Sequence, residues 1–365
     1  MRARLMGRSM TVDSRTPSKA GFAMPAEWEA HDACYMSWPC RPETWQGFHE
    51  EAKATYVAVA RAVRRFEPVI MLAPPSRVRE ARDSLGPDDE VVPMELDDAW
   101  IRDNGPIFVR RPDGRRAVVN FRFNGWGGKA PWRKDDEVPV RLAERLGMRR
   151  YDAPMVLEGG AISVDGEGTL LTTEQCLPSR NRSMSRARIE RVLADYLGIR
   201  KVIWLGRGLK GDFTGGHVDG VAGFAAPRVV VAAHAAAPSD PNRAALADNL
   251  VRLGSATDAK GRSIEVVTLP QPRPRTWQGL PVTPGYVNHY IANGGVVVPT
   301  FGISEDAAAL ATLRVLHPGR EIVGVPARYL EFGEGSVHCI TQQRPGGRGG
   351  TKAPSGPGPR RSPAA

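Results

Sequence analysis

The sequence has few cysteines and no long apolar run, and these two absences exclude several classes of protein. Its 365 residues include four cysteines, Cys34, Cys40, Cys176 and Cys339, and none of their spacings is that of paired zinc ligands. So sparse a set does not make a disulfide scaffold. No run of 18 apolar residues occurs, and the basic N-terminus lacks the apolar segment of a secretory signal. We therefore expect a cytoplasmic protein with free thiols and no membrane partner.

The excess of positive charge lies at the two ends of the sequence. The net charge of +10 at pH 7 by itself suggests a nucleic-acid-binding protein. However, residues 1–20 hold five basic and one acidic residue, and residues 344–365 hold five basic residues and no acidic one, which leaves +1 on residues 21–343. We expect both ends to be disordered and residues 21–343 to form one domain. A nucleic-acid partner is disfavoured because this domain carries no RNA- or DNA-binding motif.

Apolar residues recur at helical spacing in five segments, and a short β-rich apolar run follows each of them. A corner containing Gly or Asp and then a second predicted strand come next. Five such units, spaced by roughly 50–60 residues, indicate a repeat architecture, and we expect an α/β fold in which the units close into a ring. The predicted helices are 50–66, 138–146, 185–197, 241–253 and 304–316; the first strands are 68–72, 155–157, 202–205, 264–269 and 321–325; the second strands are 106–109, 161–164, 218–222, 286–290 and 337–341.

The corners of the units hold the residues that can carry chemistry. Asp103, Glu158, His217 with Asp219, and Cys339 lie at four of them, and a ring would turn them toward one central cavity. Carboxylates, one imidazole and one thiol suit a guanidinium, which is a planar cation whose paired N–H groups carboxylates accept.

Each of these side chains has an expected role in cleaving a guanidine. Asp103 and Asp219 clamp the guanidinium from two sides, and Cys339 attacks its central carbon as a thiolate. His217 protonates the departing nitrogen and then takes a proton from water, while Glu158 holds another N–H and shuttles protons. No metal or organic cofactor is needed for this chemistry.

A different chemistry is offered by the same histidine. The sequence His217-x-Asp219 with His289 or His338 has the form of a non-haem iron site, but it leaves Cys339 unexplained. On the predicted strand 337–341, His338 and Cys339 point to opposite faces, so His338 is a poor candidate for the catalytic base.

Nine motifs, running from about residue 21 to 343, resemble those of the agmatine deiminase family in the guanidine-modifying pentein superfamily, in its peptidyl-arginine deiminase-like branch. The resemblance implies a five-bladed α/β propeller, no metal, and hydrolysis of agmatine to N-carbamoylputrescine and ammonia. Carried over by position, it implies Cys339 as nucleophile, His217 and Glu158 as acid/base pair, Asp103 and Asp219 as clamp, and Trp100 and Trp126 as walls of the pocket. The motifs are Met24-Pro-Ala-Glu-Trp-Glu, Ser37-Trp-Pro, Asp98-Ala-Trp-Ile-Arg-Asp103-Asn-Gly-Pro, Phe123-Asn-Gly-Trp-Gly-Gly128, Leu157-Glu-Gly-Gly160, Leu171-Thr-Thr-Glu-Gln-Cys176, Gly216-His-Val-Asp219, Ile291-Ala-Asn-Gly-Gly295 and His338-Cys-Ile-Thr-Gln-Gln343.

Two segments depart from the family pattern. The stretch before His217 reads Phe-Thr-Gly-Gly, with Asp212 ahead of it, and the stretch before Val337 reads Gly-Glu-Gly-Ser, with Glu334 in second place. We expect Glu334 or Asp212 to bind the distal amine of the substrate. Arginine or peptidyl-arginine remains the alternative substrate, because distal contacts set specificity. The sequence does not fix the oligomeric state, and a homo-oligomer stays open.

Overall fold

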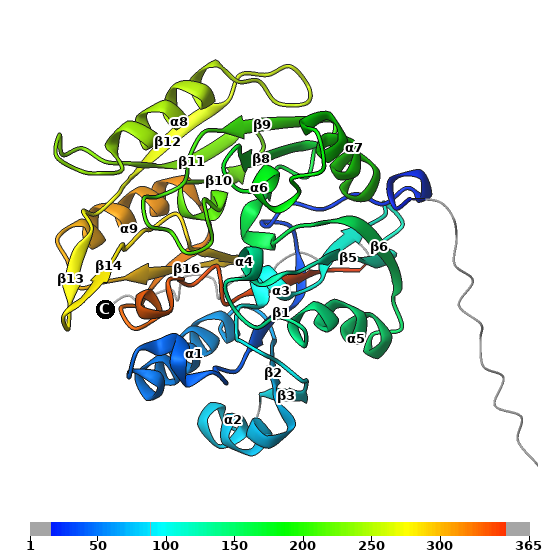
Figure 1. The fold of residues 1–365 in the computed structure, drawn as a ribbon, viewed down its shortest axis with the longest axis vertical. Coiled ribbons are helices and arrows are strands. Elements are labelled where there is room, and N and C mark those ends of the chain that lie inside the picture. Colours follow the sequence, from blue (N-terminus) through cyan, green and yellow to red (C-terminus); the bar gives the residue numbers. More distant parts are fainter. Residues whose placement is uncertain (1–15, 88, 348–365) are drawn as a thin grey trace, which may run out of the picture.

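The computed structural model describes residues 16–87 and 89–347, which form an α/β fold (Figure 1). Four segments share one order of elements: two antiparallel strands, a helix, and a third strand that pairs in parallel with the second. We call each such segment a module. The modules are β4 (Ile107–Arg110), β5 (Arg116–Arg122), α5 (Val138–Arg145) and β6 (Arg149–Val156); β7 (Ser163–Val164), β8 (Thr169–Thr173), α7 (Arg186–Leu197) and β9 (Lys201–Leu205); β10 (Ala222–Ala226), β11 (Val229–His234), α8 (Arg243–Ser255) and β12 (Glu265–Pro270); and β15 (Tyr290–Ala292), β16 (Gly295–Thr300), α9 (Glu305–Leu316) and β17 (Glu321–Pro326).

A further sheet has the same order of elements but takes its strands from both ends of the described chain. Its first strand comes from the C-terminal side and pairs antiparallel with a strand from the N-terminal side. That second strand pairs in parallel with a third, after an intervening helix, and one more helix and strand extend the sheet. In chain order these elements are β1 (His31–Ser37), α1 (His49–Arg64), β2 (Val69–Ala73), α2 (Val78–Leu85), β3 (Glu90–Pro93) and β18 (Gln342–Pro345).

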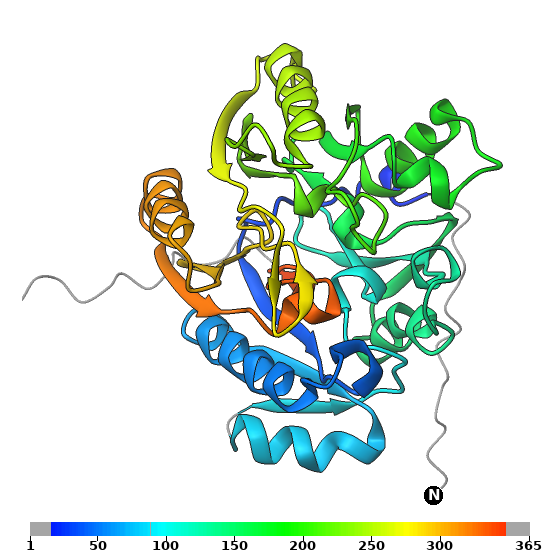
Figure 2. The ribbon, with the colours of Figure 1, turned by 60° about the vertical axis from the view of Figure 1, so that its left-hand side comes forward.

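The five predicted helices are all present as α1, α5, α7, α8 and α9, with ends shifted by no more than two residues. In α7, the Ser185 side chain accepts a hydrogen bond from the Arg188 N–H at the start, and Gly198, with a φ of 74°, ends the helix in the left-handed conformation. Each helix buries one apolar face, and in Figures 1 and 2 these helices lie toward the outside of the molecule. The largest cluster of buried apolar side chains includes residues of α1, α8 and α9.

The predicted grouping of the strands is wrong. The strands before and after each corner do not pair as a hairpin: β9, for example, closes one sheet and β10 opens the next. The apolar pattern also does not identify the middle strands, because these are buried on both faces and lack alternation. All five residues of β8, Thr-Leu-Leu-Thr-Thr, are buried.

Four of the five predicted second strands begin at least two residues before an observed strand: β7 and β15 start later than predicted, 218–222 begins as a turn, and no residue of 337–341 is in a strand. His217 precedes the short 3-10 helix η6 (Val218–Gly220), which leads into β10. Cys339 lies in a turn ahead of β18. The two-residue alternation of a strand therefore does not apply at either place, and the reason for excluding His338 from the site is lost.

Several short elements border the corners. A β-hairpin lies over the turn that follows α9 and β17, where Trp277 stacks on Phe332 with ring centroids 5.1 Å apart. These elements are α3 (Ile101–Asn104), α4 (Gly125–Gly128), η5 (Gly159–Ala161), α6 (Leu177–Arg180), β13 (Arg275–Trp277), β14 (Leu280–Val282) and η7 (Leu330–Gly333).

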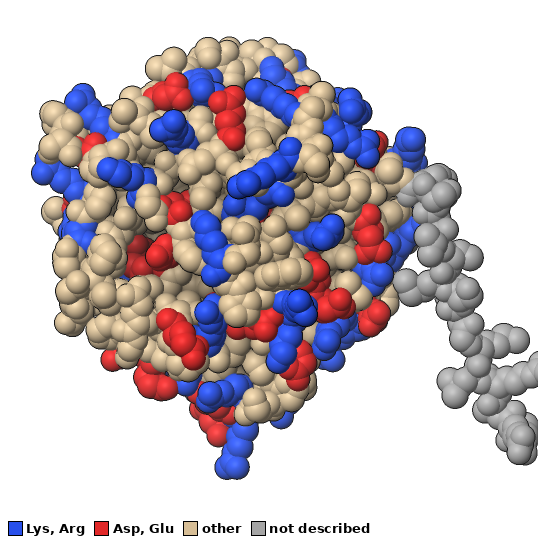
Figure 3. All heavy atoms as spheres, viewed as in Figure 1, with Lys and Arg blue, Asp and Glu red and all other residues tan. Residues whose placement is uncertain are grey.

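The described fold extends beyond both predicted domain limits, 21 and 343. Ser18–Ala20 form a 3-10 turn, and β18 continues to Pro345 because its main chain pairs with β1. The remainder of the predicted tails, 1–15 and 348–365, lies outside the described residues. Basic and acidic side chains are interspersed over the face in Figure 3. Within the described ranges, no helix has both the length and the apolar character needed to cross a bilayer.

Candidate active site

Cys339 is held in its turn by one asparagine that the sequence motifs do not single out. Asn288 Nδ2 lies 3.2 Å from Cys339 Sγ, and Asn288 Oδ1 accepts hydrogen bonds from the backbone N–H groups of His338 (3.0 Å) and Cys339 (3.3 Å). The thiol is buried, with 6% of the residue exposed. Asn288 comes just before β15, at the one corner where the sequence yields no candidate for guanidine chemistry. The equivalence of this corner to the other four is the signal that could have identified Asn288.

The two carboxylates predicted to clamp a guanidinium lie on either side of Gly160. Asp103, in α3, accepts hydrogen bonds from the Gly160 N–H (3.0 Å) and from Trp126 Nε1 (2.9 Å). Asp219 Oδ2 lies 3.7 Å from Cys339 Sγ. A Cβ at Gly160 would lie 2.6 Å from His217 Nδ1 and 2.8 Å from an oxygen of each carboxylate. These groups therefore converge on one point, which only glycine leaves free.

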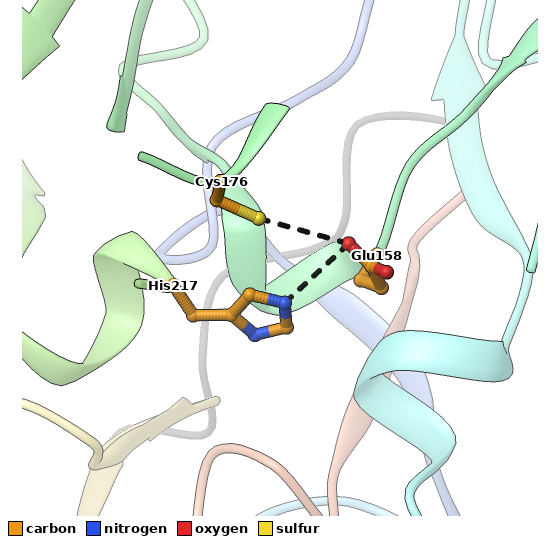
Figure 4. Close-up of side chains that lie close together, drawn as sticks. All are labelled: Glu158, Cys176 and His217. Atoms are coloured by element: carbon orange, nitrogen blue, oxygen red, sulfur yellow. Dashed lines mark hydrogen bonds and ion pairs between the residues drawn. The ribbon is translucent and has the colours of Figure 1, made fainter. Parts of the chain in front are cut away.

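His217 and Glu158 form a buried pair beside this point (Figure 4). His217 Nε2 lies 3.5 Å from Glu158 Oε2, and Arg180 Nε donates to Glu158 Oε1 at 2.7 Å. Burial opposes the charge of the imidazolium, but Asp103 and Glu158 outweigh it and raise the pKa of His217 well above its usual value. Burial also opposes ionisation of Glu158, but His217 and Arg180 prevail and lower its pKa. Both groups are therefore charged at neutral pH.

The surroundings of Cys339 keep its thiol protonated when no cation is bound. Burial, followed by the charges of Asp219 and Asp103, raises the pKa of Cys339 well above its usual value, and Asn288 offsets only part of this rise. A cation between the two aspartates would cancel the charges that oppose the thiolate. A cationic ligand at this place would therefore favour the thiolate of Cys339.

His338 lies behind the clamp, although the predicted strand turns it away from the site. His338 Nδ1 is 3.0 Å from Asp219 Oδ2, and Nε2 is 2.9 Å from Glu27 Oε1, which also pairs with Arg102 at 3.1 Å. Burial and the Arg102 charge oppose the imidazolium, but the two carboxylates raise the pKa of His338 overall. His338 is therefore a positioning residue for Asp219. Glu27 belongs to the Pro-Ala-Glu-Trp-Glu motif, which is the only sequence signal for it.

The predicted tryptophans border a cavity of about 340 Å³ that ends at Cys339. Trp126 points its indole N–H at Asp103, and Trp100 packs so closely on Gly335 that a Cβ there would overlap its ring. A second cavity of about 470 Å³ reaches Cys339 from the side of His217 and Asp219. Cys339 therefore lines both cavities, whereas Asp219 and Asn288, which contact its sulfur, line only the second.

The two acidic residues predicted to bind a distal amine are placed differently. The Asp212 carboxylate accepts hydrogen bonds from the backbone N–H groups of Thr214 (2.8 Å) and Gly216 (2.7 Å), so it shapes the loop before His217. Glu334 is exposed, has a φ of 63°, and lines both cavities. Burial and the Asp212 charge raise the pKa of Glu334.

The iron site considered from the sequence does not form among the described residues. Two groups there bring metal-binding atoms within 4.8 Å of one another, Glu158 with Cys176 and His217, and Asp165 with Glu167 and Asp258. Neither contains the pair His217 and Asp219. Asp219 faces His338 and the nucleophile instead.

Residues 23–345 match the family model of the Porphyromonas-type peptidyl-arginine deiminases. The chain belongs to this family. The agmatine deiminase of Stutzerimonas stutzeri (strain A1501) is 42% identical, over 92% of this chain and 99% of the relative. A solved structure of the agmatine deiminase of Enterococcus faecalis, described as catalysing its reaction, has a TM-score of 0.89 at 36% identity and covers 92% of this chain and 99% of that one. The family predicted from the motifs is thereby confirmed, and the α/β fold of this family member is that of the solved agmatine deiminases.

A third comparison concerns a cysteine. An agmatine deiminase of C. jejuni with one cysteine replaced by serine, solved with substrate bound, has a TM-score of 0.82 and 27% identity, and the match covers 90% of this chain and 97% of that one.

Proposed function

We propose that this family member is an agmatine deiminase that hydrolyses agmatine to N-carbamoylputrescine and ammonia through a covalent bond to Cys339. The observation that carries the proposal is the convergence of Asp103, Asp219 and His217 on the open point at Gly160, next to the thiol. A planar cation with N–H groups on two edges fits between two carboxylates. The names of the relatives favour agmatine among guanidines.

Binding prepares the nucleophile. The guanidinium donates hydrogen bonds to Asp103 and Asp219, and its charge compensates the two carboxylates that otherwise hold the proton on Cys339. The thiol proton then leaves toward Asp219 Oδ2, which is 3.7 Å away. The thiolate forms a bond to the central carbon, which becomes tetrahedral, and its negative charge neutralises the positive charge of the guanidinium.

His217 acts in both halves of the reaction. As an imidazolium, it gives a proton to the departing nitrogen, so that ammonia leaves and a positively charged thiouronium remains on Cys339. The neutral imidazole then takes a proton from water while the oxygen bonds to the same carbon. The carbon–sulfur bond breaks, the proton held by Asp219 returns to the sulfur of Cys339, and the hydroxyl proton passes to ammonia, so that the urea product is released. Glu158, paired with His217, favours the charged imidazole in each cycle. The overall change is guanidinium and water to urea and ammonium.

Glu334 is the better of the two candidates for the distal amine. Its carboxylate lies at the cavity, whereas the Asp212 carboxylate is engaged by backbone N–H groups. An anion there attracts an ammonium and repels the α-carboxylate of free arginine. We expect Glu334→Gln to raise the KM for agmatine several-fold at an unchanged kcat, and Asp212→Asn, the matched variant, to lower thermal stability. An unchanged KM in Glu334→Gln would exclude this contact.

We also propose the finer features predicted from the sequence. The five sheets, with β18 and β1 joining the two ends, support a five-bladed α/β propeller with the site at its centre. A cytoplasmic location and a small cationic guanidine as the substrate are part of the same proposal. A crystal structure with agmatine bound to the Cys339→Ser variant tests both the propeller and the assigned contacts.

Ammonia release from agmatine, free arginine and an arginine-containing peptide is the decisive assay. Agmatine should give the highest kcat/KM, Cys339→Ser should abolish release, and iodoacetamide should inactivate the enzyme while EDTA does not. Preference for the peptide would contradict the choice of substrate. Absence of turnover with all three would refute the proposal.

A further inference from the structure

Cys176 is a buried thiol that the proposed reaction does not use, and it points at the acid/base pair. It lies just before α6 and is fully buried, with Sγ 3.8 Å from Glu158 Oε2. His217 Nε2 lies 3.5 Å from the same oxygen. Figure 4 shows the thiol and the imidazole turned toward this carboxylate, and the three groups lie within 4.8 Å of one another.

His217 lacks a well-formed partner in this arrangement. Both of its ring nitrogens are buried without a hydrogen bond. Nε2 lies 3.5 Å from Glu158 Oε2, and Nδ1 lies 3.7 Å from Asp103 Oδ1. These distances are short enough for ion pairs but too long for good hydrogen bonds. Once its proton has left, an unsatisfied, fully buried nitrogen that faces a thiol and a carboxylate can donate its lone pair to a metal ion.

We propose that Glu158, Cys176 and His217 bind a thiophilic divalent cation, Zn²⁺, and that this ion reversibly inhibits the enzyme. One sulfur, one imidazole nitrogen and one carboxylate oxygen are ligands that zinc accepts, with water as the fourth, whereas Mg²⁺ and Ca²⁺ prefer oxygen alone. Metal–ligand bonds of about 2.0–2.3 Å place tetrahedral ligands about 3.3–3.6 Å apart. The two distances to Glu158 Oε2, 3.8 and 3.5 Å, need to change by only a few tenths of an ångström.

The surrounding charges also fit a divalent ion. Asp103 Oδ1 faces His217 Nδ1 from the side opposite Glu158, which is the place of the outer carboxylate in carboxylate–histidine–zinc arrangements. Arg180 holds the other oxygen of Glu158 and leaves Oε2 available. With Cys176 as a thiolate, the three negative charges of Cys176, Glu158 and Asp103 balance the two positive charges of the ion and the one of Arg180.

Binding requires that two protons leave, one from the Cys176 thiol and one from the His217 imidazolium. The affinity should therefore increase with pH. The ion reaches the site through the 470 Å³ cavity, which His217 lines.

The inhibitory part of this inference rests on the proposed function, because a metal on His217 Nε2 and Glu158 stops the proton transfers assigned to them. The binding of the ion does not depend on the proposed function. It can be measured without substrate by titrating the protein with Co²⁺, whose bond to a thiolate gives a charge-transfer absorption in the near ultraviolet.

The test uses three proteins: the wild type, Cys176→Ser, which keeps the number of side-chain atoms but replaces the sulfur by a smaller oxygen, and Cys339→Ala, which lacks the proposed nucleophile. We expect the thiolate–Co²⁺ band in the wild type and in Cys339→Ala, its loss in Cys176→Ser, and its displacement by Zn²⁺ but not by Mg²⁺. No band in the wild type would refute the site. A band that persists in Cys176→Ser and disappears in Cys339→Ala would place the ion on the nucleophile and also refute it.

Inhibition of agmatine turnover is a second, independent test of the site. Relative to its own metal-free activity, Cys176→Ser should require at least about ten times more Zn²⁺ for half-inhibition than the wild type, since one of three protein ligands is lost. Equal sensitivity of the two proteins would overturn the inference, while leaving the proposed deiminase activity intact.

Discussion

Replacing Trp126 by Phe tests whether the indole N–H holds the carboxylate that clamps the guanidinium. Trp126 Nε1 donates to Asp103 Oδ2 at 2.9 Å, and the Gly160 N–H is the other donor to this buried group. Phe keeps an aromatic ring but leaves that oxygen of Asp103 without its partner. A hydrogen bond to a charged group contributes about 1.5–3 kcal/mol, and each 1.36 kcal/mol corresponds to about a factor of ten in rate. We therefore expect kcat/KM for agmatine to fall about 10- to 150-fold.

The pH profile separates this effect from a loss of packing. Burial already raises the pKa of Asp103, while His217 and Trp126 lower it. Without the indole donor the pKa rises further, and since the clamp must be ionised, the acidic limb of kcat/KM should move to higher pH. The control is Phe123→Leu, which removes a ring 5.1 Å from Trp126 but no donor to Asp103 and should leave the limb in place. A fall of less than twofold with an unshifted limb would refute the role of the N–H.

Three further predictions concern the groups around the clamp. Glu27→Gln removes one of the two carboxylates that raise the pKa of His338, so this histidine should lose its charge at lower pH. The alkaline limb of the kcat/KM profile should therefore shift to lower pH, and an unchanged limb would contradict the coupling between Glu27 and His338. Gly160→Ala places a methyl group 2.6 Å from the imidazole, so kcat should fall at least about tenfold although the protein still folds; normal turnover would mean that the point is not the guanidinium site. Asn288→Asp puts a negative charge beside the thiol and should slow its alkylation by iodoacetamide at pH 8, whereas an unchanged rate would show that the amide does not stabilise the thiolate.

The sequence predicts the helices from apolar spacing, and its corner motifs single out Asp103, Glu158, Asp219 and Cys339 as candidates. The fold places Asp103 and Glu158 next to the His217 imidazole and Asp219 next to Cys339. The wrong strand predicted at 337–341 has a simple physical cause. Val-His-Cys-Ile-Thr is rich in β-branched residues, as strands are, but its preference is overridden by the hydrogen bonds that Asn288 makes to the turn.

Other features depend on contacts between distant segments, which no local pattern encodes. The left-handed backbone of Trp126, with a φ of 56°, turns its indole toward Asp103 rather than leaving it as a simple wall of the pocket. The Asp212 carboxylate is a plausible amine ligand by composition, yet the loop that it closes takes up both of its oxygens. Burial and backbone conformation, rather than residue type, decide these roles.

The repeat explains how residues so distant in sequence meet, and it also accounts for the one that the motifs leave out. Asp103, Glu158, Asp219 and Cys339 each lie a few residues before the first strand of a sheet, namely β4, β7, β10 and β18, and Asn288 occupies the same place before β15. No single module therefore contains the site. The nucleophile depends on a pairing across the whole chain, because β18, which follows Cys339, is held by β1. The thiol is consequently placed beside Asp219 only when the two ends of the fold have come together.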